Sequence, residues 1–362
     1  MANILYGGKN NMKIQLTKNK EVYNSCRPYI IAEIGANHNG DMSLAKKMID
    51  AAVNCGCDAV KFQSWTKSSL ISKSEYKANT KYTDSKKKHF GSLEEMVDAY
   101  YLRTEQHYEL RDYCKLKGID FNSTPFDFKE VDLLNDLGVD FYKVASMDIN
   151  NLTLLKYIAK FNKPVVLSTG MATLDEIEMA IKVIESENNN NIVLLHCIAL
   201  YPPKNKEINL RNITMMQNVF KYPVGFSDHS IGYAIPLASV VLGSCIIEKH
   251  FTIDKGLPGW DHEISANPEE MKVIVDGAKK IHESLGQMER VISDAEEEKK
   301  KKFRRSIVIN KQMNKGDVLE EEGVSFKRPG TGIPPEELKY ILGKIVNKNL
   351  DIDHILTAED LI

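Results

Sequence analysis

Eight short apolar runs, rich in β-branched residues, alternate with helical stretches along most of this chain. The strand candidates span 29–33, 59–63, 119–123, 141–145, 165–168, 192–196, 224–227 and 246–250. The helical segments span 43–54, 105–116, 129–137, 152–161, 174–187, 210–220, 235–242 and 267–285. Strict alternation implies parallel strands joined by right-handed crossovers. Eight such units predict an α/β fold, a closed (β/α)8 TIM barrel. An open doubly wound sheet is the main rival, but no GxGxxG follows the first run.

The remaining sequence predicts a second, smaller domain. The barrel domain is expected over 1–285. Its first 27 residues precede the first barrel strand and could form a hairpin that plugs the bottom of the barrel. Residues 286–303 contain the charge run EEEKKKK and predict a solvated linker or helix end. Residues 304–362 hold two short strand candidates, Pro-Gly and Pro-Pro breaks and a short helix, which predict a compact domain of about 60 residues.

Charge and cysteine content exclude several classes of protein. The 48 basic and 50 acidic residues give a net charge of −2, which offers no broad basic surface for nucleic acid or an anionic membrane. No apolar run approaches the roughly 20 residues of a membrane span, and the N-terminus lacks the pattern of a signal peptide. The six cysteines show neither disulfide-framework nor zinc spacing. We therefore expect a cytoplasmic protein with reduced thiols.

Polar side chains gather at the ends of the predicted strands, where the active sites of TIM barrels lie. Since side chains alternate along a strand, residues two apart share a face. Burial of a charged group without a partner is costly, so inward-facing charges must meet each other, a metal or a ligand. The inward residues predicted in this way are Glu33, Lys61, Gln63, Lys143, Ser168, Glu248, His229 and His250.

Two of these residues, His229 and His250, end neighbouring strands about 4.8 Å apart. The pair predicts a shared divalent metal, Mn2+ or Mg2+, because carboxylates and water would complete its coordination. His38 is equally compatible with substrate contact and with loop structure, whereas His196 is interpreted as a core histidine. Lys61 and Lys143, with the hydroxyls of Ser168 and Ser227, would suit a ligand that carries both phosphate and carboxylate.

Taken together, eight sequence motifs resemble the sialic acid synthase family, the N-acetylneuraminate synthases and their legionaminate and pseudaminate relatives. They are IAEIGANHNGD (31–41), VKFQ (60–63), NSTPFD (122–127), YKVAS (142–146), LSTGMA (167–172), LLHC (194–197), FSDHS (226–230) and EKHFTIDK (248–255). The tail, with KGD (315–317) and KRPGTG (327–332), resembles the small antifreeze-like (SAF) domain that ends these enzymes.

The resemblance implies a metal-dependent condensation of phosphoenolpyruvate with an N-acyl amino sugar, in a domain-swapped homodimer. By motif position, His229 and His250 match metal ligands and Glu33 matches the active-site glutamate. Contacts to phosphoenolpyruvate are implied for Lys61, Lys143, Ser146, Ser168 and Ser227. Contacts around the amino sugar and the metal are implied for Gln63, Asp148, Tyr201 and Asp261, and for Arg328 reaching across from the partner chain.

Three departures from the neuraminate pattern leave the sugar open. Asp148 stands where many members have glutamate, Ala199 stands where bacterial neuraminate enzymes often have asparagine, and Trp260 places an indole beside the metal region. N-acetylmannosamine and a diacetamido-trideoxy hexose both remain candidates. A 3-deoxy-octulosonate or heptulosonate phosphate synthase is the second enzymatic interpretation, against which the SAF-like tail argues. A non-enzymatic SAF-type binding protein would require inert strand-end charges.

Overall fold

A computed structural model describes residues 12–80 and 92–362 of the chain. The chain divides into two compact units, one ending at Gly286 and one running from Gln287 to Ile362.

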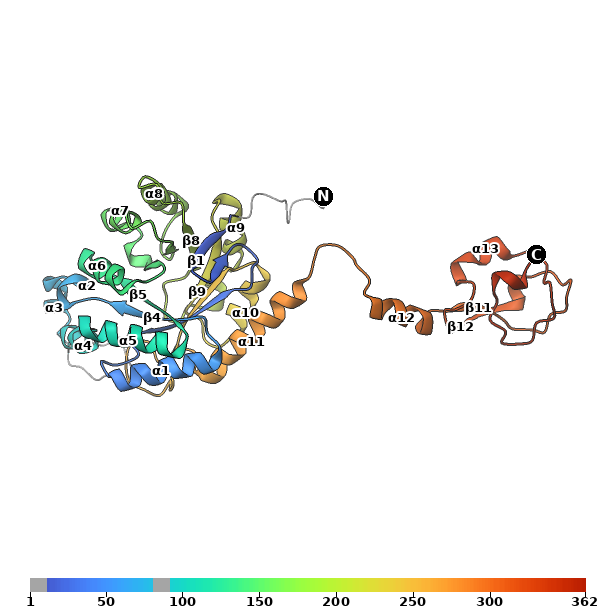
Figure 1. The fold of residues 1–362 in the computed structure, drawn as a ribbon, viewed down its shortest axis with the longest axis horizontal. Helices are drawn as coiled ribbons and strands as arrows, with labels where there is room; N and C mark the ends of the chain where they lie inside the picture. Colours follow the sequence, from blue (N-terminus) through green and yellow to red (C-terminus); the bar gives the residue numbers. More distant parts are fainter. Residues whose placement is uncertain (1–11, 81–91) are drawn as a thin grey trace. The chain divides into compact units, whose positions relative to one another are not determined.

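The first unit is built around eight parallel strands, of which β4, β5, β8 and β9 are labelled in Figure 1. They are β3 (Tyr29–Gly35), β4 (Ala59–Ser64), β5 (Asp120–Pro125), β6 (Tyr142–Val144), β7 (Val165–Ser168), β8 (Ile192–Cys197), β9 (Val224–Asp228) and β10 (Ile246–His250). Their hydrogen-bonded order is β5-β4-β3-β10-β9-β8-β7-β6, so the first and last barrel strands of the sequence lie side by side. This is the predicted TIM barrel, with β10 closing onto β3 through the register Glu248–Ile31 and His250–Glu33.

The remaining seam, between β5 and β6, is bridged by a side chain. The amide Nδ2 of Asn122 donates a hydrogen bond of 2.7 Å to the carbonyl oxygen of Phe141, at the start of β6. Asn122 is fully buried. A polar amide inside the barrel therefore connects two strands at the one junction where the backbone ladder is interrupted.

Helices surround the strands, as Figure 1 shows. They are α1 (Met42–Cys55), α5 (Thr104–Lys117), α6 (Phe128–Leu137), α7 (Leu152–Ala159), α8 (Leu174–Glu185), α9 (Arg211–Val219), α10 (Ala234–Val241) and α11 (Pro268–Leu285). Local chemistry sets their ends. The Asp41 carboxylate caps α1 by accepting from the backbone of Ser43 and Leu44, and Gly56 ends it at φ 84°. The insertion between β4 and α5 was not predicted as helical; it contains α2 (Lys67–Leu70), α3 (Lys73–Ala78) and α4 (Leu93–Tyr100).

An antiparallel hairpin, β1 (Ile14–Thr17) and β2 (Lys20–Val22), precedes the barrel. Its apolar residues Ile14, Leu16 and Val22 are buried. They pack with inward residues from the starts of the barrel strands, among them Ile31 and Ile246. The hairpin therefore closes the N-terminal end of the barrel, as the sequence suggested for this extension; residues 1–11 lie outside the described residues.

The second unit begins with α12 (Asp294–Phe303), whose side chains are almost all exposed, in keeping with a solvated charge run. An antiparallel pair follows, β11 (Ser306–Ile309) and β12 (Val324–Lys327), and then α13 (Leu338–Ile341). Its core is small and aliphatic and consists of Ile307, Ile309, Met313, Leu319, Val324, Ile341, Val346, Leu350 and Leu356.

All six cysteines are free thiols, as expected. None of the helices within residues 12–80 and 92–362 combines the length and apolar character that crossing a bilayer requires. The cytoplasmic location stays a prediction.

Candidate active site

A cavity of about 230 Å³ opens at the C-terminal ends of the barrel strands. Eleven of the fourteen predicted residues line it, namely Glu33, Lys61, Gln63, Lys143, Ser146, Ser168, Tyr201, Ser227, His229, Glu248 and His250. They come from β3, β4, β6, β7, β9 and β10 and from the loops that follow these strands. This is the end of the barrel at which the fold places its active sites.

The charged residues of the cavity form one network, as their burial required. The ammonium group Nζ of Lys61 lies 2.7 Å from Oε2 of Glu33 and 3.8 Å from Oε2 of Glu248. Oε1 of Glu248 lies 3.5 Å from Nζ of Lys143. Nζ of Lys143 donates to Oγ of Ser168 at 2.7 Å. Two cations and two carboxylates thus alternate around the interior, all less than a tenth exposed.

Period-two alternation explains how these groups reach one cavity. Ala59 and Lys61 share the inward face of β4, and Ile246 and Glu248 share that of β10, with the apolar member lower in each case. The same parity places Ser227 opposite Glu248 across the β9–β10 ladder. Its hydroxyl donates to Oε1 of Glu248 at 2.9 Å. The lower barrel is therefore apolar and the upper barrel polar.

Burial shifts the protonation equilibria of the network in opposite directions. It raises the pKa of Glu33 to about 7, although the neighbouring Lys61 opposes that rise. Burial lowers the pKa of Lys143, an effect that Glu248 opposes. Burial also acts to raise the pKa of Glu248, but two flanking ammonium groups outweigh it and hold that pKa below its ordinary value. Glu248 is therefore the permanent anion of the site, and Glu33 is able to exchange a proton near neutral pH.

The two histidines at the ends of β9 and β10 face each other, with ring centroids 5.4 Å apart. Nδ1 of His229 lies 2.9 Å from the carbonyl oxygen of Ile198, which orients the ring and leaves Nε2 as the nitrogen that a metal could use. Nδ1 of His250 is buried without a hydrogen-bond partner and lies 3.7 Å from Oδ2 of Asp261. The ring of Tyr201 covers His229 at 4.1 Å between centroids.

These donors fit an open divalent-metal site. Within residues 12–80 and 92–362, no three His, Cys, Asp or Glu side chains are grouped closely enough to hold an ion on their own. Two imidazoles, one with a buried nitrogen that lacks a partner, would leave the other coordination positions to water and substrate. Two nitrogen ligands with a carboxylate nearby are compatible with Mn2+ or Mg2+ but do not distinguish them.

The hydroxyl of Ser146 is held close to the strand-end loop after β7. Its Oγ accepts a hydrogen bond of 3.0 Å from the backbone N–H of Gly170. A Cβ at Gly170 would lie 2.7 Å from that oxygen, so the glycine makes this close approach possible. The result is a row of hydroxyls, Ser146, Ser168 and Ser227, beside the two lysines.

Three predicted residues do not line the cavity. Asp148 follows β6 in a short 3-10 turn, where its Oδ2 is buried without a hydrogen-bond partner. Asp261 lies next to the cavity, with Oδ2 3.7 Å from Nδ1 of His250. Arg328 belongs to the second unit, where its guanidinium lies 5.0 Å from the ring centroid of Phe303. The roles given to these three residues stay predictions.

The structure decides the interpretation of two further histidines and one tryptophan. His38 is fully buried in the loop after β3, where its Nδ1 accepts from the backbone of Gly40, so it is a loop-stabilising residue. His196 is a core residue, as expected, with Nε2 2.7 Å from the carbonyl oxygen of Ile208. Trp260 packs against Trp65 and Tyr100, so its indole is part of an aromatic cluster.

Two polar side chains of the cavity were missed from the sequence, Thr124 and Cys197. Thr124 accepts a hydrogen bond of 2.8 Å from Nζ of Lys61, and it escaped notice because the strand was expected to end at Ser123. Cys197 ends β8 on the inward face, two residues beyond Leu195. Each lies one residue beyond the expected end of its strand and on the face opposite to that of Ser123 or His196, so a longer strand with the same parity would not have found either.

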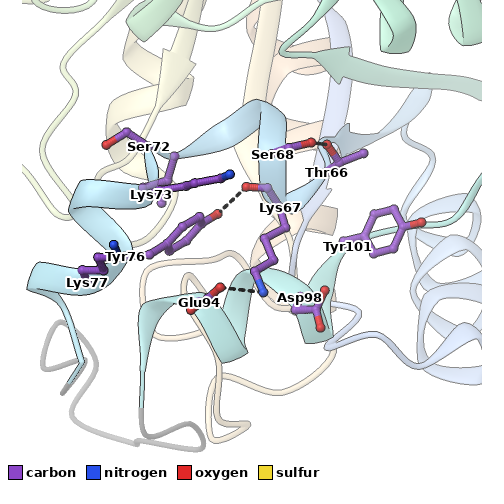
Figure 2. Close-up of a pocket in the computed structure, with 11 residues that line it drawn as sticks. Thr66, Lys67, Ser68, Ser72, Lys73, Tyr76, Lys77, Glu94, Asp98 and Tyr101 are labelled. Carbon is purple, nitrogen blue, oxygen red and sulfur yellow. Dashed lines mark hydrogen bonds and ion pairs between the residues drawn. The ribbon is translucent and has the colours of Figure 1, made fainter.

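A second hollow, of about 680 Å³, lies among α2, α3 and α4. Figure 2 shows the side chains that line it, with Lys67 bridging to Oε1 of Glu94 at 2.6 Å. The side chains of this pair are about half exposed. The hollow therefore lacks the buried, alternating charges of the barrel cavity and belongs to the surface.

Known proteins resemble the chain over both units. The profile of the NeuB family matches residues 48–290, and that of the SAF domain matches 304–362. N,N'-diacetyllegionaminic acid synthase of Campylobacter jejuni is 42% identical, with 90% of this chain and 98% of that protein covered. The enzyme of the same name from Legionella pneumophila is 38% identical over 97% and 99%.

A solved structure agrees with these relatives. The N-acetylneuraminic acid (sialic acid) synthetase of Leptospira borgpetersenii superposes with a TM-score of 0.71 at 34% identity, covering 80% of this chain and 95% of that one. The resemblance noted in the motifs is therefore confirmed. With its eight-stranded barrel, its strand-end cavity and its C-terminal SAF domain, the chain belongs to the NeuB family of sialic acid synthase-like enzymes.

Proposed function

We propose that the protein condenses phosphoenolpyruvate with an N-acyl amino sugar to give a nonulosonic (sialic-type) acid and inorganic phosphate. The observation that carries this proposal is the cavity itself. It places two buried lysines and a row of serine hydroxyls beside a pair of inward-facing histidines. The names of the related synthases support the same class of product.

Phosphoenolpyruvate would occupy the lysine and serine side of the cavity. Its phosphate and carboxylate need several donors within a small volume, and Lys61, Lys143, Ser146, Ser168 and Ser227 supply ammonium and hydroxyl groups there. Lys61 and Lys143 are already aimed inward by their contacts with Glu248. Such preorganised donors hold the ligand in attack geometry with little reorganisation.

The acceptor aldehyde would lie on the histidine side. His229 and His250 would hold a divalent ion, which when bound supplies Lewis-acid chemistry to the aldehyde oxygen. Tyr201, stacked on His229, would form one wall for the sugar. The ring of Tyr201 is about half exposed, so it is able to contact a ligand that enters from solvent.

C3 of phosphoenolpyruvate bonds to the aldehyde carbon, whose oxygen takes a proton from solvent and becomes a hydroxyl. The cation that develops at C2 is quenched by water, and Glu33 accepts the proton that this water loses and returns it to solvent. The bond between C2 and the bridging oxygen of the phosphate ester then breaks, and phosphate leaves with that oxygen. The C2 hydroxyl becomes a ketone, and its proton goes to the departing phosphate. Glu33 must be ionised for this role, and its pKa of about 7 allows that in neutral solution.

The favoured acceptor is a diacetamido-trideoxy hexose, which makes the enzyme a legionaminate-type synthase. The relatives named above at 42% and 38% identity are legionaminic acid synthases. Two methionines at the cavity rim, Met147 and Met171, expose 58% and 72% of their surface. Thioether side chains suit the methyl group of a 6-deoxy sugar better than a hydroxymethyl group, which loses hydration against them.

A substrate panel tests the reaction and the acceptor together. Purified enzyme with Mn2+ and phosphoenolpyruvate is offered the diacetamido-trideoxy hexose, N-acetylmannosamine or arabinose 5-phosphate, and phosphate release and product mass are measured. We expect turnover with the first, weaker turnover with the second and none with the third. Turnover only with arabinose 5-phosphate would replace this proposal with an octulosonate-phosphate synthase.

The metal dependence has its own test. Chelation, or the substitution His250→Ala, should abolish phosphate release, because the aldehyde would lose its activation. His38→Ala, at a buried histidine outside the cavity, is the matched control. The folded fraction of this variant should still release phosphate in a Mn2+-dependent way. Activity unchanged after exhaustive chelation would contradict the metal role.

The second unit is proposed to complete the partner's site in a swapped homodimer, with Arg328 contacting the N-acyl group. Complementation gives a sharp test. Chains with His250→Ala and chains with Arg328→Ala are inactive alone, but a mixed dimer would contain one site with both native residues. Unfolding and refolding the two together should restore roughly a quarter of wild-type activity, since half the dimers are mixed and half their sites intact. No recovery in mixed dimers, verified by native mass spectrometry, would contradict the swap.

A further inference from the structure

The two strands that end in the candidate metal ligands are also joined on their outer face. Lys249 and Asp228 stand opposite each other in the β9–β10 register, one residue before His250 and His229 respectively. Nζ of Lys249 lies 2.7 Å from Oδ2 of Asp228. The two side chains are 0% and 1% exposed. Neither residue lines the cavity, and the proposed reaction uses neither.

This ion pair also binds the backbone of Ser230, the residue that follows His229. Oδ1 of Asp228 accepts a hydrogen bond of 2.9 Å from the backbone N–H of Ser230. Nζ of Lys249 donates to the carbonyl oxygen of the same residue. The backbone N–H and carbonyl groups of Ser230 are therefore both held by the pair, and His229 lies between Asp228 and Ser230.

His229 is thus anchored at three points. Its ring is oriented by the carbonyl oxygen of Ile198, and its backbone is held from one side by Asp228 and from the other through Ser230. Lys249 belongs to the strand that carries His250, so the same ammonium group connects the backbones of both histidines. We propose that Lys249 and Asp228 are positioning residues that set the separation of His229 and His250 and thereby the affinity for the divalent metal.

The proposal rests on the metal site of the proposed function. A positioning role can be distinguished from a role in folding by comparing a variant that removes one charge with a variant that removes both. Loss of Lys249 alone would leave the Asp228 carboxylate buried and unpaired, which destabilises the whole barrel. The double variant Asp228→Asn with Lys249→Met removes both charges at similar volume and keeps an oxygen that can accept from Ser230. Its fold is expected to survive, because replacing both members of a buried pair is tolerated far better than removing one. Only the hold on the Ser230 carbonyl is lost.

The experiment uses the full-length, metal-free protein and Mn2+ alone as the probe. Mn2+ binding is measured by calorimetry and by the electron paramagnetic resonance signal of free Mn2+, and the urea midpoint is measured on the same samples. We expect the double variant to unfold near the wild-type midpoint and to bind Mn2+ about 10- to 100-fold more weakly, as is typical when partners of metal ligands are lost. Phosphoenolpyruvate binding without metal should stay unchanged.

Two controls frame the result. His250→Ala should lose Mn2+ binding. Arg27→Met removes another strand-linking ion pair, with Asp58 at the opposite end of the barrel, and should leave Mn2+ affinity unchanged. If the double variant does not fold, Asp228→Glu serves instead, because it keeps both charges but displaces the carboxylate from Ser230; the same weakening of Mn2+ binding is expected.

The outcomes separate the two claims. A folded double variant, or a folded Asp228→Glu, with wild-type Mn2+ affinity would overturn the positioning role and leave the proposed function intact. A wild-type protein that does not bind Mn2+ would remove the metal site from the proposed function, and the positioning role with it.

Discussion

Two buried charge clusters flank the same strand, and their contrast distinguishes a binding site from a structural ion pair. On the inner face of β10, Glu248 shares its carboxylate with two lysines at 3.5 and 3.8 Å, and its Oε2 lacks a hydrogen-bond partner. On the outer face, Lys249 meets Asp228 at 2.7 Å, and both oxygens of that carboxylate are engaged. The inner cluster surrounds a cavity, whereas the outer pair is packed tightly and does not line that cavity.

The two clusters are expected to differ in what they contribute to the protein, one to stability and the other to ligand binding. A closely paired buried charge contributes little net stability, but breaking the pair is costly. A buried cluster that surrounds a cavity and keeps carboxylate oxygens without hydrogen-bond partners has spare capacity, which a ligand with matching charges can use. Substitutions on the outer face should therefore act first on folding, and substitutions on the inner face should act first on turnover.

The largest effect is expected on the outer face. Lys249→Met should lower the free energy of unfolding by about 3–5 kcal/mol, because Asp228 would remain as an uncompensated buried anion. Urea unfolding followed by circular dichroism measures this loss, and adding Asp228→Asn should recover most of it. A single variant as stable as the wild type would mean that Asp228 reaches solvent or takes up a proton on folding, and the contrast between the two faces would fail.

The next effect lies on the inner face. Lys61→Met should lower kcat/KM for phosphoenolpyruvate by about 10²–10³-fold, as is typical for loss of one preorganised charged donor. The change in unfolding free energy should be smaller than for Lys249, since Glu33 can take up a proton when its partner is lost. Lys67→Met, at the exposed pair in Figure 2, is the matched control and should change neither quantity. An unchanged kcat/KM would exclude Lys61 from the binding site.

The pH dependence of kcat/KM tests the role of Glu33 in the inner cluster. Its pKa is raised from 4.5 to about 7 by burial, so kcat/KM should rise with pH up to about 7 and then level. Glu33→Gln should remove that limb and lower the plateau about 100-fold. Between pH 4.5 and about 7 the carboxyl group of Glu33 is protonated in the folded chain and ionised in the unfolded chain. Its contribution to the free energy of unfolding should therefore fall as pH rises through this range, and this dependence should be absent in Glu33→Gln. If kcat/KM of Glu33→Gln still rises with pH up to about 7, the titrating group is a residue other than Glu33.

The smallest effect tests a single hydrogen bond of the inner cluster. Ser168→Ala removes the acceptor 2.7 Å from Nζ of Lys143 and should raise KM for phosphoenolpyruvate about fivefold, as expected for one hydrogen bond. Thermal unfolding should be almost unaffected, because the cavity can admit water at this point. A large loss of stability instead would show that Ser168 supports the barrel more than the ligand.

The barrel and most of the residues that line its cavity could be predicted from the amino-acid sequence. Alternating apolar strands and amphipathic helices specify parallel units, because each pattern buries its apolar face in only one arrangement. Period-two parity then aimed Lys61, Lys143 and Glu248 inward, and the cost of burying lone charges required them to meet. Both inferences use only local periodicity, so they hold without knowledge of the three-dimensional structure.

Only the tertiary structure decided which groups are partners. The side-chain bridge from Asn122 across the β5–β6 seam, the helices of the 67–100 insertion and the site residues Thr124 and Cys197 depend on contacts between distant segments. The outer pair is the clearest case. Asp228 and Lys249 are 21 residues apart, and nothing local indicates that one carboxylate and one ammonium group together hold Ser230. The register between β9 and β10 creates that contact, because pairing across a sheet is fixed by the whole barrel rather than by either strand.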